Sequence, residues 1–199
     1  MIDFSESLRS KKFYRFTGTP ENWLTAIKYM TWGLKKEYQE RWEKIQPGDI
    51  FFMHSTGESI FNKGKSGIIG IGVVGADFSV KESSLWIEEL EKKENLWPLL
   101  VPFSEIYLFS ELPPKNLWEA PEPKNFDKVP ALISALLHHV VPLSHHPQFP
   151  TMGSFSTVQF SVAESILAEN KSLYEYRTET AVAFILEKPT QLQFVKNVS

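Results

Sequence analysis

The sequence contains no cysteine among its 199 residues. Disulfide bonds, thiolate metal ligands and cysteine nucleophiles are therefore excluded. The chain also has no apolar run long enough to span a bilayer and no signal-peptide pattern at its N-terminus, so we expect a cytoplasmic protein with no membrane partner. It has no internal repeat and no low-complexity tract.

Motifs for enzymatic chemistry are missing as well. The sequence has neither a phosphate-binding P-loop nor a G-x-S-x-G nucleophile elbow. Two histidine pairs, His138-His139 and His145-His146, have no carboxylate interleaved at ligand spacing, so we interpret them as structural or surface residues. The sequence thus predicts a binding domain that is not an enzyme by itself, with no metal and no cofactor.

The chain has little net charge. It carries 21 basic and 24 acidic residues, for a formal charge of −3 at pH 7. A protein that coats nucleic acid through charge alone is usually basic, so any nucleic-acid contact would come from a local patch. With 42% hydrophobic residues, the length suits one domain with a substantial core.

A strand, a turn and a helix are predicted between residues 11 and 33. Residues 13–16 have strand chemistry, and residues 17–20 form a turn in which Thr19 can cap a helix and Pro20 can begin it. Apolar residues at helical spacing extend to residue 30, and we expect the helix to end in Thr31-Trp32-Gly33. Further strands are expected at 50–55, 67–75 and 99–110. Further helices are expected at 84–93, 129–141 and 161–170, with Ser161 as the last one's N-cap.

The spacing of Thr17, Glu21-Asn22 and Trp32-Gly33 resembles the opening of the YTH domain, the family that recognises N6-methyladenine. Thr17 stands where that family usually has serine. Residues 47–55, 67–74 and 153–155 are similar to the related EVE domains of the PUA-like superfamily. The resemblance implies an α/β (α+β) fold with a twisted mixed β-sheet, curled toward a partial barrel and flanked by helices. It places this domain at residues 11–187, after an N-terminal extension (1–10) and before a tail or linker (188–199).

The resemblance also implies an aromatic cage for a methylated base. Trp32 matches the first cage tryptophan, and Trp86 and Trp97 have the separation of the two later cage walls. Asn22 would bond the edge of the base, the Gly33 carbonyl would accept the remaining N6–H, and Thr17 would orient the turn. Tryptophans can also be core residues: we assign Trp23 and Trp42 to the core, and for Trp86 and Trp97 both roles fit.

A stacked base must be flipped out of duplex DNA before it can enter a cage, at a cost of a few kcal/mol. Phosphate contacts would then hold the strand. The candidates are the lysines near the predicted cage and one serine, although each lysine fits a solvated surface equally well: Lys11, Lys12, Lys35, Lys36, Lys63, Lys65 and Ser154.

The function implied by the resemblance is recognition of N6-methyladenine in double-stranded DNA. Domains of this kind form the N-terminal DNA-recognition module of archaeal McrB-like restriction proteins, whose AAA+ GTPase motor recruits a McrC-like nuclease. We expect the domain alone to be monomeric. Three alternatives stay open: a reader of another modified base such as 5-methylcytosine, a reader of methylated RNA, and a small-molecule or protein-interaction domain that uses the same groove.

Overall fold

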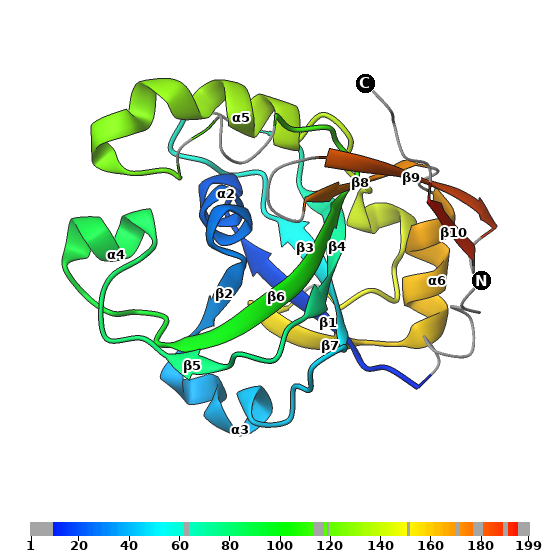
Figure 1. Cartoon of the computed structure of the whole chain (residues 1–199), viewed down its shortest axis with the longest axis horizontal. Coiled ribbons are helices and arrows are strands. Elements are labelled where there is room, and N and C mark those ends of the chain that lie inside the picture. The colour runs from blue at the N-terminus through cyan, green and yellow to red at the C-terminus, as the bar shows by residue number, and fades with distance from the viewer. Residues whose placement is uncertain are drawn as a thin grey trace.

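The computed structural model describes residues 10–61, 64–113, 118, 120–150, 152–169, 172–176, 181–188 and 191–194. The strands in this part of the chain form a sheet of ten strands in the order β10-β9-β8-β6-β4-β3-β1-β7, and β2 and β5 also pair with β6 (Figure 1). The strands are β1 (Phe13–Gly18), β2 (Thr31–Leu34), β3 (Ile50–Ser55), β4 (Gly67–Val74), β5 (Ser79–Val80), β6 (Leu99–Leu108), β7 (Phe155–Val158), β8 (Ser172–Tyr176), β9 (Ala181–Lys188) and β10 (Gln191–Phe194).

The sheet is mixed, because β1 pairs with β3 in parallel and with β7 antiparallel. The long strand β6 curls the sheet: its first residues pair with β2 and β5, and its later residues pair with β4 and β8. Helices flank the strands (Figure 1). The structure therefore confirms a mixed α/β class with a curled sheet.

The helices in the described residues are α2 (Pro20–Tyr29), α3 (Gln39–Trp42), α4 (Ile87–Lys92), α5 (Val129–Leu136) and α6 (Phe160–Glu169). Short 3-10 turns lie at η1 (Lys36–Tyr38), η3 (Pro123–Lys128) and η4 (Leu143–His145). In this part of the chain, no helix is long and apolar enough to cross a membrane.

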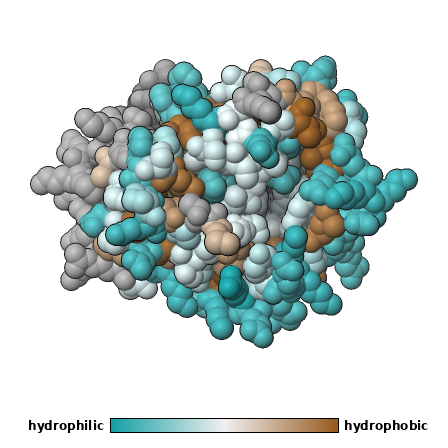
Figure 2. All heavy atoms as spheres, turned by 180° about the vertical axis from the view of Figure 1, so that it is seen from behind, coloured by the Kyte–Doolittle hydropathy of each residue, from teal (hydrophilic) through white to brown (hydrophobic). Residues whose placement is uncertain are grey.

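Successive side chains of the central strands point to opposite faces of the sheet. Phe51 belongs to the core cluster that α2 and α5 cover, whereas its neighbour Phe52 belongs to the cluster that α6 covers. On the face seen from behind, hydrophilic side chains surround separate apolar patches (Figure 2). The candidate site described below belongs to the α2 side.

Helix α2 begins as predicted but ends earlier. The Thr19 side chain accepts a hydrogen bond from the Asn22 backbone N–H, and Pro20 is the first helical residue. The helix ends at Tyr29, and Met30 takes a left-handed conformation with φ of 53°. The expected ending in Thr31-Trp32-Gly33 is wrong, because these residues form β2 and pair with β6, where Trp32 lies opposite Val101.

Other boundaries differ in similar ways. The strands expected at 50–55, 67–75 and 99–110 correspond to β3, β4 and β6. The helix expected at 129–141 ends at Leu136, because Val141 exchanges two backbone hydrogen bonds with Ile68 on β4. The helix α4 is shorter than the expected 84–93, and α6 begins at Phe160, so Ser161 is not its N-cap.

The two ends of the chain lie at the limits of what the structure describes. Of the N-terminal extension assigned to residues 1–10, only Ser10 lies inside the described residues. Within the segment assigned as a tail, Gln191–Phe194 forms β10 and pairs antiparallel with β9.

Candidate functional site

Six residues predicted to contact a modified base lie around one cavity of about 40 Å³. They come from the end of β1, the first turn of α2, β2 and the segment that carries α4. The cavity is lined by Thr17, Asn22, Trp32, Gly33, Leu34, Lys35, Trp86, Trp97 and Ser154. We call this space the tryptophan cavity. Two of the predicted phosphate contacts, Lys35 and Ser154, are also among its lining residues.

Trp32 forms a fixed wall of the tryptophan cavity. It stacks on Trp23, with ring centroids 4.2 Å apart and planes 22° apart, and lies nearly parallel to Phe16 at 6.2 Å. Only 6% of its surface is exposed. A Cβ atom at Gly18 would clash with the end of the Trp32 ring, so a glycine is needed there.

Trp86 and Trp97 form the opposite wall. The Trp86 ring contacts Trp32 edge to face at 6.4 Å and Trp97 edge to face at 5.8 Å. Trp86 is buried, whereas Trp97 is half-buried. Gly33 allows this approach, because a Cβ atom there would lie 2.6 Å from both Trp86 Cη2 and Trp97 Cβ. Three indoles thus meet at close range around a glycine.

A buried carboxylate holds both of these tryptophans. Glu89, on α4, is fully buried, and its two oxygens accept hydrogen bonds from the backbone N–H groups of Trp86 at 3.3 Å and Trp97 at 2.9 Å. The same carboxylate accepts from the Leu85 N–H and forms an ion pair of 2.6 Å with Lys81. Burial lowers the pKa of Lys81, and the Glu89 carboxylate opposes that shift. Glu89 therefore fixes the backbone at both positions of the wall.

The indole N–H groups separate the six tryptophans into two sets. Those of Trp23, Trp42 and Trp118 each donate to a main-chain carbonyl, of His54, Leu100 and Pro113 respectively. Within the described residues, the indole N–H groups of the three cavity tryptophans make no hydrogen bond: Trp32, Trp86 and Trp97. The first set is tied into the fold. Trp23 is a buried core residue, as predicted, whereas Trp42 is half-buried and packs against the core.

Asn22 presents an unused acceptor at the tryptophan cavity. Its Oδ1 atom is buried and has no hydrogen-bond partner among the described residues. An unpaired buried amide oxygen costs about 1–3 kcal/mol, so such an atom is uncommon unless a ligand or water satisfies it. Asn22 thus has the chemistry to bind an N–H donor inside the cavity.

Thr17 joins the cavity to a neutral histidine. Thr17 Oγ1 shares a hydrogen bond of 3.1 Å with Nδ1 of His54, its partner in the β1–β3 register. Burial, followed by the positive charge of Arg15, lowers the pKa of His54 to about 4. His54 is therefore neutral at pH 7 and orients Thr17 without adding charge. The structure buries the His54 side chain.

Arg15 fixes the loop that carries Ser154. It is fully buried on β1, and its guanidinium donates to the carbonyls of Pro150, Met152 and Gly153. Burial lowers the pKa of Arg15. Thr17 N–H then donates to the Ser154 carbonyl at 2.9 Å, which brings this residue to the cavity.

The other predicted phosphate contacts lie elsewhere. Lys12 lines a different and larger pocket, and Lys36 lines a separate hollow beside Trp42. Lys11 reaches Gly48, Lys65 is exposed in the loop after β3, and Lys63 lies outside the described residues. The structure thus brings Lys35 and Ser154 to the tryptophan cavity and leaves these five lysines away from it or undescribed.

Sequence reasoning missed Glu89 and Arg15. Arg15 had a signal, because a charged residue between Tyr14 and Phe16 in a buried strand needs a partner. Glu89 had none, since its role depends on backbone groups that only the fold brings together. No group of three or more histidine, aspartate or glutamate side chains suited to a metal occurs in the described part of the chain.

Comparisons with known proteins add no family assignment. No protein-family model matches the sequence, and no curated protein matches it. The chemistry of the site alone therefore defines its class. It is a small, tryptophan-walled cavity with one unsatisfied amide and no built catalytic group among the described residues that line it.

Proposed function

We propose that the chain is a DNA-binding module that recognises N6-methyladenine by taking the flipped base into the tryptophan cavity. One observation carries the proposal. The six residues that the YTH resemblance assigns to the base are six of the nine residues around a single cavity. They are separated by up to 80 positions in the sequence, from Thr17 to Trp97. The mixed curled sheet supports the further proposal that the fold is PUA-like, of the EVE/YTH type.

Each wall of the cavity has a role in this proposal. Trp32 offers one ring face for stacking, since Trp23 occupies the other. Trp86 and Trp97 supply apolar surface against the second face and the methyl group. The Gly33 carbonyl accepts the single remaining N6–H of the base, and the Asn22 side-chain amide bonds the ring edge, where its N–H can donate to a ring nitrogen. The methyl group itself contributes about 1–3 kcal/mol, so the polar contacts must distinguish adenine from other bases.

Binding requires the cavity to open. About 10–15 Å³ of such a cavity holds one water molecule, so a volume of about 40 Å³ holds only a few waters and is too small for a purine. Trp97 is the movable wall in this proposal, because it is half-buried and its indole N–H is not tied to the fold. Trp32, stacked between Trp23 and the cavity, stays in place.

The wider role follows the same resemblance. In this proposal the module delivers methylated double-stranded DNA to an AAA+ GTPase motor elsewhere in an archaeal McrB-like protein, and a McrC-like nuclease cuts the DNA. The module has no catalytic function of its own and needs no cofactor.

The test is binding to labelled duplexes that contain one N6-methyladenine, one 5-methylcytosine or no modification, beside a methylated RNA of the same sequence. We expect the N6-methyladenine duplex to bind at least about tenfold more tightly than the unmodified one. The Asn22→Ala and Trp97→Ala variants should lose this preference. Equal affinity for all duplexes would overturn the proposal, and preference for 5-methylcytosine or RNA would assign the cavity to one of those ligands.

A further inference from the structure

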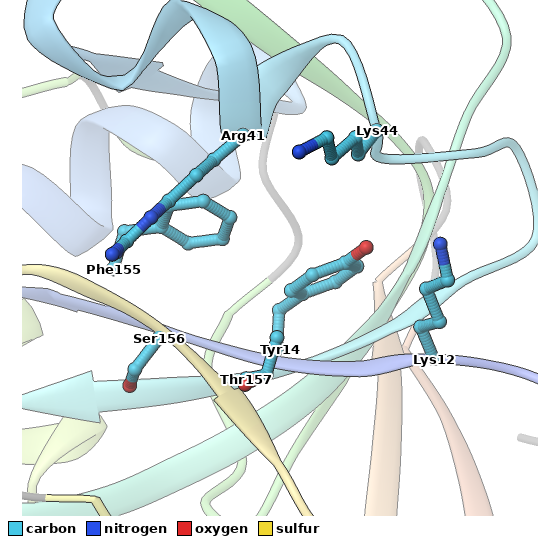
Figure 3. A pocket seen from close by; sticks show the side chains of 7 residues that line it. All are labelled: Lys12, Tyr14, Arg41, Lys44, Phe155, Ser156 and Thr157. Carbon is cyan, nitrogen blue, oxygen red and sulfur yellow. The ribbon is translucent and has the colours of Figure 1, made fainter.

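A second and much larger pocket lies beside the first strand. It has a volume of about 430 Å³. Figure 3 shows the side chains that line it. Tyr14, on β1, and Lys12, just before that strand, line one part of it. Arg41, on α3, and Lys44, in the turn after that helix, line another part. Phe155 and Thr157 line it from β7. We call it the basic pocket. The proposed base-binding site does not use it, although Lys12 was one of the predicted phosphate contacts.

The charge of the basic pocket contrasts with that of the chain. Lys12, Arg41 and Lys44 place three positive charges around it, and the lining residues in the described structure include no carboxylate. The whole chain, in comparison, has a net charge of −3. Figure 3 shows Arg41 and Lys12 on opposite sides of the Tyr14 ring, with Lys44 above the ring between them. Such a concentration of cations favours an anion with more than one negative charge.

One carboxylate, that of Asp49, acts on Tyr14, so the three cations of the pocket have one negative charge close to them. The two carboxylate oxygens of Asp49 accept backbone N–H groups of Lys12 at 3.1 Å and Gln46 at 2.9 Å. Burial, and then Asp49, raises the pKa of Tyr14 to about 12. Tyr14 therefore keeps its proton at neutral pH and adds no negative charge to the pocket.

The floor of the basic pocket is aromatic. The rings of Tyr14 and Phe155 lie 5.4 Å apart, and Phe155 stacks on Phe16 behind it at 5.5 Å. Arg41 lies over the ring of Tyr38 at 5.9 Å, which helps to hold its side chain at the rim. The pocket is therefore preformed, with an apolar base and a cationic rim.

Size and shape indicate a small ligand. Small-molecule sites commonly measure about 300–1,000 Å³, and the basic pocket falls in this range. A groove that follows a nucleic-acid backbone has its cations spread along a track. Here they surround one hollow. A terminal phosphate carries a charge of about −1.5 to −2 at pH 7, more than the single charge of an internal phosphodiester.

We propose that the basic pocket binds a terminal phosphate monoester attached to a planar group, as in a nucleoside monophosphate or the 5′-phosphorylated end of a strand. Arg41, Lys44 and Lys12 hold the phosphate, and the Tyr14–Phe155 floor supports the sugar or base. This site is separate from the tryptophan cavity and does not depend on it.

Calorimetric titration with AMP tests the proposal, with adenosine as the uncharged comparison. We expect AMP to bind, and adenosine to bind at least about tenfold more weakly, because it lacks the charge-assisted hydrogen bonds. The double variant Arg41→Gln/Lys44→Gln should weaken AMP binding by a similar factor. These residues are exposed, so the melting temperature should stay at the wild-type value.

Matched variants identify the site. Lys128→Gln removes one charge next to α5, far from α3 (Figure 1), and should leave AMP affinity unchanged. Trp97→Ala should also leave it unchanged. The proposal is overturned if AMP and adenosine bind equally, or if the double variant binds AMP like the wild type. Loss of AMP binding in Trp97→Ala alone would assign the nucleotide to the tryptophan cavity and also overturn it.

Tetranucleotides distinguish the two sources of the phosphate. If a strand end is the ligand, the 5′-phosphorylated tetranucleotide binds more tightly than the same sequence with a 5′-hydroxyl. If the ligand is a free nucleotide, AMP binds and neither tetranucleotide does. Equal binding of both tetranucleotides would show that internal phosphates suffice, which contradicts a terminal phosphate site.

Discussion

Trp32 lies stacked on Trp23, with ring centroids 4.2 Å apart and planes 22° apart. Trp23 is fully buried, and its indole N–H donates to the His54 carbonyl at 2.8 Å. A ring that is itself anchored therefore supports one face of Trp32. Trp32 also lines the tryptophan cavity, so it has a core role and is available for a binding role at the same time.

This double role makes the stability of cage variants predictable. Trp32→Ala should lower the free energy of unfolding by about 3–5 kcal/mol, because it opens a void beside Trp23. Trp97→Ala, at a half-buried position, should cost about 1–2 kcal/mol. Urea denaturation measures both values. Equal costs for the two variants would contradict the distinction between a fixed and a movable wall, and binding is better tested with Trp97→Ala.

Asn22 should matter for binding and hardly for stability. Its buried Oδ1 atom has no partner among the described residues, so Asn22→Ala should leave the free energy of unfolding unchanged or raise it by up to about 1 kcal/mol. Binding of methylated DNA should fall at least about tenfold, by the loss of one buried hydrogen bond.

A buried asparagine of another kind provides the control. Asn125 Oδ1 accepts from the Glu122 N–H at 2.9 Å, and its Nδ2 donates to the Ala120 carbonyl at 2.9 Å. Asn125→Ala should therefore cost about 1–3 kcal/mol, with methylated-DNA affinity retained. If both alanine variants destabilise the protein equally, Asn22 is a structural residue.

Glu89→Gln should disturb the wall formed by Trp86 and Trp97. Removing the charge leaves Lys81 buried without its partner and weakens the hydrogen bonds to the two tryptophan N–H groups. We expect a loss of about 3 kcal/mol in unfolding free energy. Acrylamide quenching of tryptophan fluorescence should increase, because Trp97 becomes more accessible.

Glu88 is the matched control for Glu89. It lies next to Glu89 on the same helix, but its ion pair with Lys92 is exposed to solvent. Exposed pairs of this kind contribute little, so Glu88→Gln should change neither stability nor quenching measurably. Identical behaviour of the two variants would show that Glu89 does not hold the tryptophan wall.

His54 predicts a particular dependence of stability on pH. Its pKa is about 4 in the folded protein and 6.5 without the fold. Above pH 6.5 the imidazole is neutral in both states. As the pH falls from 6.5 to 4, the unfolded chain binds a proton that the folded chain does not, so the unfolding free energy decreases, by up to about 3 kcal/mol.

Urea denaturation at several pH values between 7 and 4 measures this effect. Other groups titrate in the same range, so the comparison is with His54→Gln, which lacks the imidazole. The variant should lose less stability than the wild type across this interval. The same loss in both proteins would show that the His54 pKa is not lowered by its burial beside Arg15.

The YTH resemblance pointed to Thr17, Asn22 and Trp32, which the structure places around one cavity, and their binding role stays a prediction. Their spacing can be matched whether Trp32 ends a helix or begins a strand. Whether Thr31–Leu34 is helical depends on β6, about 70 positions later, whose backbone offers β2 its hydrogen bonds. Local propensity contains no information about that partner.

The supporting residues show the same limit. Glu89 lies in a short acidic helix that suggests only a solvated surface, and its carboxylate acquires a role because the chain returns at Trp97. Arg41 and Lys44 were not predicted either, since only the fold brings them and Lys12 around one pocket. Residues defined by long-range backbone contacts require the fold.

Indole resonances give the most direct test of the cage. In a ¹⁵N-labelled protein each of the six tryptophans gives one indole N–H signal, assigned by single substitutions. Titration with DNA that carries N6-methyladenine should shift the signals of Trp32, Trp86 and Trp97 and leave those of Trp42 and Trp118 in place, while unmodified DNA should not shift the three cavity signals. If the three cavity signals stay unmoved, or move equally with unmodified DNA, the tryptophan cavity does not receive the methylated base.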